Sequence, residues 1–196
     1  MKLILENWKK YLKEGIHPKI QNQINILLEE PELIVWIRHQ DDYMEIRYHG
    51  SDDIKGDVEA SKAEGSGSHA HGGGLCHSGF VIQNTEATSG MGPLLYEVAI
   101  EYASQVGGGL ISDRRTVSSD ARAVWDKYAK RLDIGKKQLD TNDSDMTQLT
   151  PDDPKDDCTV HGEDQSWVKD PLNKVYYKKT QEVITALKKA GRLRVS

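Results

Sequence analysis

The chain contains only two cysteines, one phenylalanine and no long apolar run. A membrane-spanning helix needs about 18 consecutive apolar residues, and a signal peptide needs a shorter apolar core behind its first residues. Neither is present, so we expect a protein that does not enter a membrane and is made in a cytoplasm. A reducing cytosol favours free thiols at Cys76 and Cys158, and a single disulfide between them is the alternative.

An excess of positive charge is also missing. The formal net charge is −5, and the charged residues, 29% of the chain, are mixed in sign. Proteins that coat nucleic acid need clustered Lys and Arg to bind phosphates, so a nucleic-acid partner is disfavoured. Lysine and arginine do gather within residues 9–19 and 178–194, where a solvated surface is the simpler interpretation. A hydrophobic content of 37% in 196 residues predicts one domain with a modest core and substantial exposed loops.

The most informative stretch runs from residue 80 to residue 103. The apolar residues 80–82 predict a buried strand, Gly90 and Gly92 predict a tight turn, and Pro93 suits the first turn of a helix. Because the first N–H groups of a helix are unpaired and its dipole is positive there, such a turn can bind a phosphate. A glycine turn between a strand and a helix also occurs without any ligand, so a purely structural turn is the alternative.

Strands and helices alternate along the rest of the chain. Residues 107–114 predict a short strand, and residues 118–128 predict a helix capped by Ser118. Upstream, the apolar patterns predict a helix and three strands: residues 20–28, 33–37, 43–48 and 54–60. Downstream, they predict strand, helix and strand: residues 175–177, 180–190 and 193–195. This order predicts a mixed α/β (α+β) domain whose central sheet is antiparallel at first and splays near Asn84.

The order and the amino-acid sequence of these segments, over about residues 33–130, resemble the second half of the GCN5-related N-acetyltransferases (GNAT). In that family the turn after the fourth strand reads Arg/Gln-x-x-Gly-x-Gly/Ala, and its backbone amides bind the pyrophosphate of acetyl-coenzyme A. Residues 87–92 match at both glycines, whereas Ala87 stands in place of the Arg or Gln. The resemblance implies acetyl-CoA as the cofactor, bound by the turn residues Thr88, Ser89, Gly90, Met91 and Gly92.

Within the family, the sequence is similar to those of GNAT-like proteins of tailed bacteriophages. The similarity lies in residues 92–103, the Ser-Asp-Arg that precedes the second helix, and two later segments, 138–140 and 149–151. The resemblance implies a GNAT-like domain over residues 15–196, with a mostly antiparallel sheet flanked by helices. It places the protein in the cytoplasm of a bacterial host. Flexible loops are expected near residues 61–77 and 140–165.

The family's reaction is the direct attack of an amine on the acetyl thioester, without a covalent enzyme intermediate. A tyrosine on the helix after the fifth strand often serves as the acid in relatives, and Tyr128 takes that place here. The alternative for Tyr128 is a core residue with its hydroxyl at the rim. Glu86 is the nearest carboxylate to the turn and the candidate base, with a water relay as the alternative. The acceptor is an unidentified amine of a small molecule or a protein.

A second hypothesis is a GNAT-like virion or interaction protein that has lost catalysis, which Ala87 favours. Residues 1–14 predict an amphipathic helix, with an apolar stripe formed by Leu5, Trp8, Tyr11 and Leu12. This helix resembles the short leaders that carry proteins into the heads of large tailed phages. The triplet Leu-Lys-Glu at residues 12–14 fits the form cleaved there, and it implies phage head components as partners. A plain packing helix is the alternative.

Two segments have the composition of metal sites but not the spacing. His69, His71, Cys76 and His77 could offer a tetrahedral set of nitrogen and sulfur ligands, yet their spacing matches no zinc finger, and ordering a glycine-rich loop costs entropy. The acidic segment 140–157 fails as an EF-hand because Asp145 and Pro151 replace the required glycine and glutamate. We therefore predict no metal, and expect both segments to be solvated loops.

Overall fold

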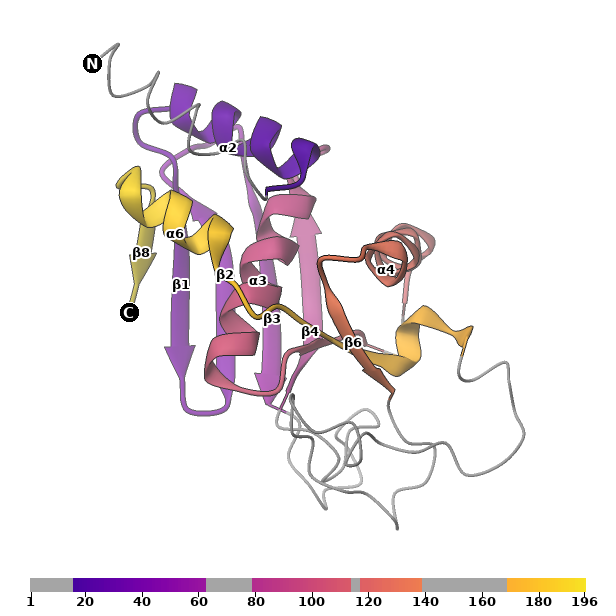
Figure 1. Ribbon diagram of the computed structural model, residues 1–196. Helices are drawn as coiled ribbons and strands as arrows, with labels where there is room; N and C mark the ends of the chain where they lie inside the picture. Colours follow the sequence, from indigo (N-terminus) through magenta and orange to yellow (C-terminus); the bar gives the residue numbers. More distant parts are fainter. Residues whose placement is uncertain (1–15, 63–78, 114–116, 139–168) are drawn as a thin grey trace.

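The computed structural model describes residues 16–62, 79–113, 117–138 and 169–196 (Figure 1). Its helices and strands follow the order α2 (Pro18–Glu29), β1 (Ile34–Gln40), β2 (Tyr43–His49), β3 (Gly56–Lys62), β4 (Phe80–Ala87), α3 (Gly92–Val106), β5 (Leu110–Ile111), α4 (Ser119–Lys130), β6 (Gly135–Gln138), the 3₁₀ helix η3 (Pro171–Asn173), β7 (Lys174–Tyr177), α6 (Glu182–Lys189) and β8 (Leu193–Val195).

The strands form one sheet of eight, in the spatial order β6-β7-β5-β4-β3-β2-β1-β8. The pairs β1–β8 and β4–β5 are parallel, and the remaining pairs are antiparallel. Strands β1 to β4 are consecutive in the chain and adjacent in the sheet, as expected for an antiparallel meander. The predicted fold class, a mixed α+β domain with a mostly antiparallel sheet, is confirmed.

Strands β4 and β5 separate soon after they meet. They are paired only through Phe80 with Leu110 and Val81 with Ile111. Strand β4 then continues along β3 as far as Ala87. Beyond Val81, β4 has no strand partner on the β5 side among the residues that the structure describes. The sheet therefore splays between β4 and β5, as the sequence predicted for this part of the chain.

Three helices, α2, α3 and α6, lie on one face of the sheet (Figure 1). Helix α2 buries Ile20, Ile24 and Leu27 at the three- and four-residue spacing of one helical face. Helix α3 is buried over residues 94–103 on all sides, because it lies between the sheet and the other helices. Burial of each large apolar side chain stabilises the fold by about 1.5–3 kcal/mol, so α3 is the centre of the core.

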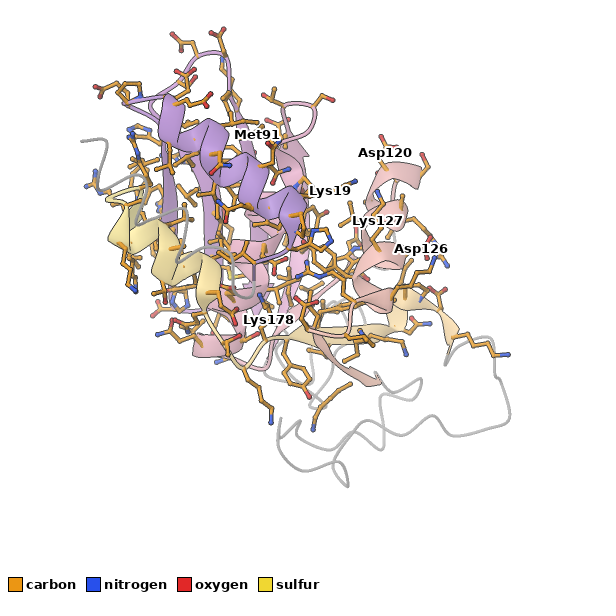
Figure 2. The ribbon with its side chains drawn as sticks, turned by 45° about the horizontal axis from the view of Figure 1, so that its top comes forward. Lys19, Met91, Asp120, Asp126, Lys127 and Lys178 are labelled. Atoms are coloured by element: carbon orange, nitrogen blue, oxygen red, sulfur yellow. The ribbon has the colours of Figure 1, made fainter. Side chains whose placement is uncertain are left out.

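Two carboxylates of α3 are buried with a lysine between them. Lys178 follows β7, where the chain turns toward α6 (Figure 2), and its Nζ lies 2.8 Å from Glu97 Oε1 and 3.0 Å from Glu101 Oε1. The Glu101 carboxylate also accepts hydrogen bonds from the N–H groups of Val183 and Ile184 in the first turn of α6. Burial nevertheless holds the pKa of Glu101 above its usual range. This ion cluster joins α3 to the chain segment that leads into α6.

The predicted and observed boundaries differ in a few places. Strand β3 begins at Gly56 and ends at Lys62, two residues later at each end than the predicted 54–60, and β4 continues to Ala87, beyond the predicted 80–84. Strand β6 was not predicted, because Gly-Lys-Lys-Gln lacks the apolar alternation of a half-buried strand. None of the helices in the described part of the chain has the length and apolarity that a membrane crossing requires.

Several predictions lie outside the described residues. These are the helix or leader over residues 1–14, the loops near 61–77 (from residue 63 on) and 140–165, and a set of side chains proposed as metal ligands or thiols: His69, His71, Cys76, His77 and Cys158.

Candidate functional site

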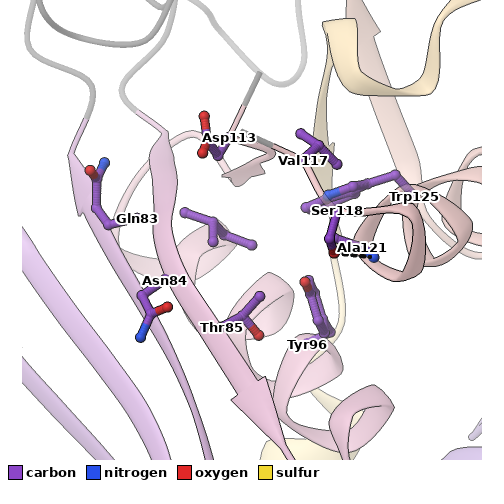
Figure 3. A pocket seen from close by; sticks show the side chains of 10 residues that line it. Gln83, Asn84, Thr85, Tyr96, Asp113, Val117, Ser118, Ala121 and Trp125 are labelled. Carbon is purple, nitrogen blue, oxygen red and sulfur yellow. Dashed lines mark hydrogen bonds between the residues drawn. The ribbon is translucent and has the colours of Figure 1, made fainter. Parts of the chain in front are cut away.

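A cavity of about 310 Å³ lies in the gap between β4 and the segment that follows β5 (Figure 3). Strand β4, helix α3 and helix α4 each contribute to its wall. The lining residues are Ile82, Gln83, Asn84, Thr85, Tyr96, Asp113, Val117, Ser118, Ala121 and Trp125. The cavity is therefore a product of the splay, because a paired β5 would fill this space.

Helix α4 presents one face to the cavity. Its N-terminus is fixed by Ser118, whose hydroxyl accepts a hydrogen bond from the Ala121 N–H at 3.2 Å. Trp125 is buried against the cavity. Figure 2 shows the charged residues Asp120, Asp126 and Lys127 on the outer surface of α4. This amphipathic pattern turns the apolar face of α4 toward the cavity. The helix thereby closes the cavity on the side away from β4.

Tyr96 is the hydroxyl-bearing aromatic residue of the cavity wall. It lies on α3, and its ring packs edge-on against Trp125 with the ring centroids 5.7 Å apart. Figure 3 shows Tyr96 and Thr85 on facing sides of the space between α3 and β4. Burial raises the pKa of Tyr96, and a hydrogen bond with Thr85 acts in the opposite direction. Tyr96 is thus protonated at neutral pH and can donate a hydrogen bond or a proton within the cavity.

The predicted phosphate-binding turn, residues 88–92, connects β4 to α3. The Met91 N–H donates to the Thr88 carbonyl at 2.9 Å, and Gly90 has a φ of +85°. A positive φ at the third residue is typical of a type II turn, and it explains the glycine. The Thr88 N–H donates to the Lys55 carbonyl at 2.8 Å. Two of the five predicted amides, those of Thr88 and Met91, are therefore engaged within the protein.

The other three amides of the turn have no such partner. The structure records no hydrogen bond from the N–H groups of Ser89, Gly90 or Gly92 to any other described residue. A Cβ added to Gly90 would meet no atom within 4 Å, and one added to Gly92 would meet only the Ala87 Cβ, at 3.5 Å. The side of the turn that carries these two glycines is open. Three amides at the N-terminus of a helix of this length suit an anion.

Tyr128, the predicted acid, does not line the cavity. It is only 4% exposed, and its hydroxyl lies 3.4 Å from the Pro93 carbonyl and 3.4 Å from Glu97 Oε2. Burial and the negative charge of Glu97 raise the pKa of Tyr128 well above its usual range. The Arg131 guanidinium lies over the ring, 5.2 Å from its centroid. Tyr128 is therefore part of the core and of the ion cluster around Glu97.

Glu86, the predicted base, is exposed on β4 and also lies outside the cavity lining. Its Cα is paired with that of Asp57 on β3. Successive side chains of a strand point to opposite faces, so Glu86 and its cavity-lining neighbour Thr85 lie on different faces of the sheet. Asp57 has a pKa raised to about 6, by burial first and then by the charges of Glu59 and Glu86. The structure therefore does not bring Glu86 and Tyr128 together.

The cavity residues Tyr96, Thr85 and Trp125 were missed by the sequence analysis. A signal for Tyr96 was present, because it follows Gly92 by four residues and so lies on the same side of α3. Trp125 was read only as part of a helical pattern. Nothing in the sequence marked Thr85, whose role depends on the separation of β5 from β4.

Comparison with protein-family models, with curated proteins and with solved structures finds no match to this chain. The features of the structure that bear on function are the splay, the cavity and the turn.

Proposed function

We propose that this protein is an acetyl-CoA-dependent N-acyltransferase that transfers an acetyl group directly to an amine. The observation that carries the proposal is the separation of β4 from β5 beside the N-terminus of α3. That separation produces a partly apolar cavity, and the strand that lines it leads directly into a turn with three available amides. An elongated ligand with a diphosphate at one point and a small reactive group at its end suits this arrangement.

The residues present fit such a ligand. The N–H groups of Ser89, Gly90 and Gly92 would hold the diphosphate, with the positive end of the α3 dipole behind them. Ile82 and Trp125 supply apolar wall for the connecting arm. When bound, acetyl-CoA supplies the acetyl group as a thioester. Thr88 and Met91 stay in the proposal as residues that shape the turn, because their own amides are engaged.

Tyr96 is the residue that we assign to proton donation in the cavity. Its hydroxyl is protonated at neutral pH, and its side chain lines the cavity beside Trp125 of α4. Glu86 remains the candidate base. Because Glu86 does not line the cavity, it would accept the proton of the acceptor amine through water. The acceptor, a small-molecule or protein amine, and an action in the cytoplasm of a bacterial host are part of this proposal.

A GNAT-like protein that no longer binds the cofactor is the second candidate, and one observation favours it. Ala87 replaces the Arg or Gln of the family's turn, so the turn lacks a side chain that could contact the phosphates. In that case the cavity would be a vestige, and the surface would serve contacts with phage head components in a virion.

Isothermal titration of the full chain with acetyl-CoA separates the two candidates. We expect saturable binding at one site, and S-acetylpantetheine, which lacks the diphosphate, should bind at least ten times more weakly, a difference of about 1.4 kcal/mol. Inorganic pyrophosphate should compete with acetyl-CoA. No detectable binding of acetyl-CoA would contradict the acyltransferase proposal and favour the second candidate.

A further inference from the structure

Two buried side chains form hydrogen bonds with the turn at residues 88–92 on the side that faces the interior of the protein. The Tyr48 hydroxyl, on β2, donates to the Met91 carbonyl at 2.9 Å. The Gln23 amide nitrogen, on α2, donates to the Gly90 carbonyl. Tyr48 is 7% exposed and Gln23 is 5% exposed. Two neighbouring carbonyls of one turn are thus bound by side chains from two elements that are far apart in the sequence.

Gln23 is a polar residue on the buried, otherwise apolar face of α2. Ile20, Ile24 and Leu27 surround it on the buried face of the helix, where a leucine would satisfy packing alone. The amide oxygen of Gln23 is buried without a hydrogen-bond partner among the described residues. Burying a polar group in this way costs free energy unless it forms a hydrogen bond. The bond to Gly90 is the feature of Gln23 that a leucine would lack.

The hydrogen bond from Tyr48 fixes the direction of the next amide. In a trans peptide the C=O of one residue and the N–H of the next point in opposite directions. Because the Met91 carbonyl points toward Tyr48 and β2, the Gly92 N–H points away from them. The bond from Gln23 fixes the adjoining peptide in the same manner, and there the Met91 N–H closes the turn on the Thr88 carbonyl.

We propose that Tyr48 and Gln23 are positioning residues that hold the turn in the form that presents the Gly92 N–H to a diphosphate. The inference rests on the proposed function and deepens it. A turn that is already ordered binds its ligand more tightly than one that must be ordered on binding, because less conformational entropy is lost. Neither residue contacts the ligand, and both act through the backbone of the turn.

Tyr48→Phe tests the proposal because it removes one hydroxyl and keeps the buried ring. Loss of one such hydrogen bond should weaken acetyl-CoA binding by about fivefold. The affinity for S-acetylpantetheine, which has no diphosphate, should not change. Gln23→Leu keeps the side-chain volume, removes the donor to Gly90, and should act in the same direction. It serves as the second variant if Tyr48→Phe does not fold.

Tyr102→Phe is the matched control. Tyr102 is a similarly buried tyrosine whose hydroxyl lies 3.2 Å from His39 Nδ1. It lies ten residues after Gly92 on the same helix, about 15 Å away along the axis. This variant should lose stability much as Tyr48→Phe does, and its affinity for acetyl-CoA should not change. A purely structural role for Tyr48 would give the two variants the same behaviour.

The outcomes separate this inference from the proposed function. Parent protein that binds acetyl-CoA, together with folded Tyr48→Phe and Gln23→Leu variants of unchanged affinity, would overturn the inference alone. Parent protein that binds no acetyl-CoA would overturn both. The ¹⁵N–¹H signal of Gly92 gives a second readout: pyrophosphate should shift it in the parent, and the shift should be smaller in Tyr48→Phe. An equal shift in both would contradict the positioning role.

Discussion

The hydroxyl of Tyr128 lies 3.4 Å from Glu97 Oε2, in the interior between α3 and α4. Glu97 also accepts hydrogen bonds from Arg131 Nη2 at 3.0 Å and from Lys178 Nζ at 2.8 Å. Tyr128 is thereby part of a buried ionic group, while Tyr96, whose ring centroid lies 6.2 Å from that of Tyr128, lines the cavity. The tyrosine that the resemblance suggested as the acid therefore lies in the buried ion cluster and is not among the residues that line the cavity.

We expect Tyr96→Phe to lower turnover by about 10²-fold or more, the usual range for loss of a general acid, with little change in acetyl-CoA affinity. Tyr128→Phe should leave turnover within about threefold, and lower the free energy of unfolding by about 0.5–1.5 kcal/mol through the lost hydrogen bond. Thiol release from acetyl-CoA with a panel of primary amines measures the first, and urea unfolding measures the second. A large loss of turnover confined to Tyr128→Phe would instead assign the general acid to Tyr128.

Gly92→Val should weaken acetyl-CoA binding tenfold or more and leave the thermal midpoint unchanged. The φ of Gly92 is not positive, and an added Cβ would meet only the Ala87 Cβ, at 3.5 Å. The loss of affinity would come from side-chain atoms beside the amide that faces the ligand.

Gly90→Ala tests the role of the turn at residues 88–92, and Gly191→Ala, outside that turn, is its matched control. Both glycines have a positive φ, +85° and +67°, and open space around the added Cβ. Each substitution should cost about 1–2 kcal/mol of stability, because an L-residue is strained in this conformation. Titration should show weaker binding of acetyl-CoA for Gly90→Ala alone. Equal affinities in the two variants would place the diphosphate elsewhere.

Lys178→Met should be strongly destabilising, by about 3–5 kcal/mol, because it leaves Glu101 buried without its cation and leaves Glu97 with Arg131 alone. Urea unfolding of the parent and the variant measures the loss. Lys188→Met, at an exposed position on α6, is the control and should change stability by less than about 0.5 kcal/mol. A small effect at Lys178 would show that the two carboxylates are protonated or hydrated in the folded state.

Asp57→Asn should raise the thermal midpoint at pH 7 and have little effect near pH 4. The folded pKa of Asp57, about 6, lies above the usual aspartate value of 3.8, so the folded protein binds this proton more tightly than the unfolded chain. The ionised carboxylate therefore reduces stability, and the reduction develops as the pH rises from about 4 to 6. Melts of parent and variant from pH 4 to pH 7 measure it. A midpoint difference that did not depend on pH would contradict the assignment.

The sequence predicted those parts of the fold whose patterns are local. The helix from Gly92, the strands at 33–37 and 43–48 and the strand beginning at Phe80 follow from apolar spacing and from turn residues. Strand β6 was not predicted, and β7 was predicted as a strand but without its place in the sheet. Strand β6 is polar, and β7 enters the sheet between β5 and β6, a position that no local pattern encodes. Its partners are separated from it by tens of residues.

Of the candidate site, only the turn at residues 88–92 could be predicted from the sequence. The glycine turn has a local signature, because Gly90 needs a conformation that other residues resist. The choice between Tyr96 and Tyr128 depends on where β5 leaves β4 and on which tyrosine Glu97 faces. Both are properties of packing between segments far apart in the chain. For the same reason, the contacts of Gln23 and Tyr48 with the turn leave no trace in the sequence.

The position of β7 and β8 in the sheet affects how the protein acquires its fold during synthesis. Residues 174–177 form a strand between β5 and β6, and residues 193–195 extend the opposite edge beside β1. Until the ribosome has released these residues, β5 has an unpaired edge and Glu97 and Glu101 lack the ammonium group of Lys178. Long-range pairing of this kind is slow and leaves strand edges exposed to other chains. The strands that are synthesised earlier therefore depend on β7 and β8 for protection from aggregation.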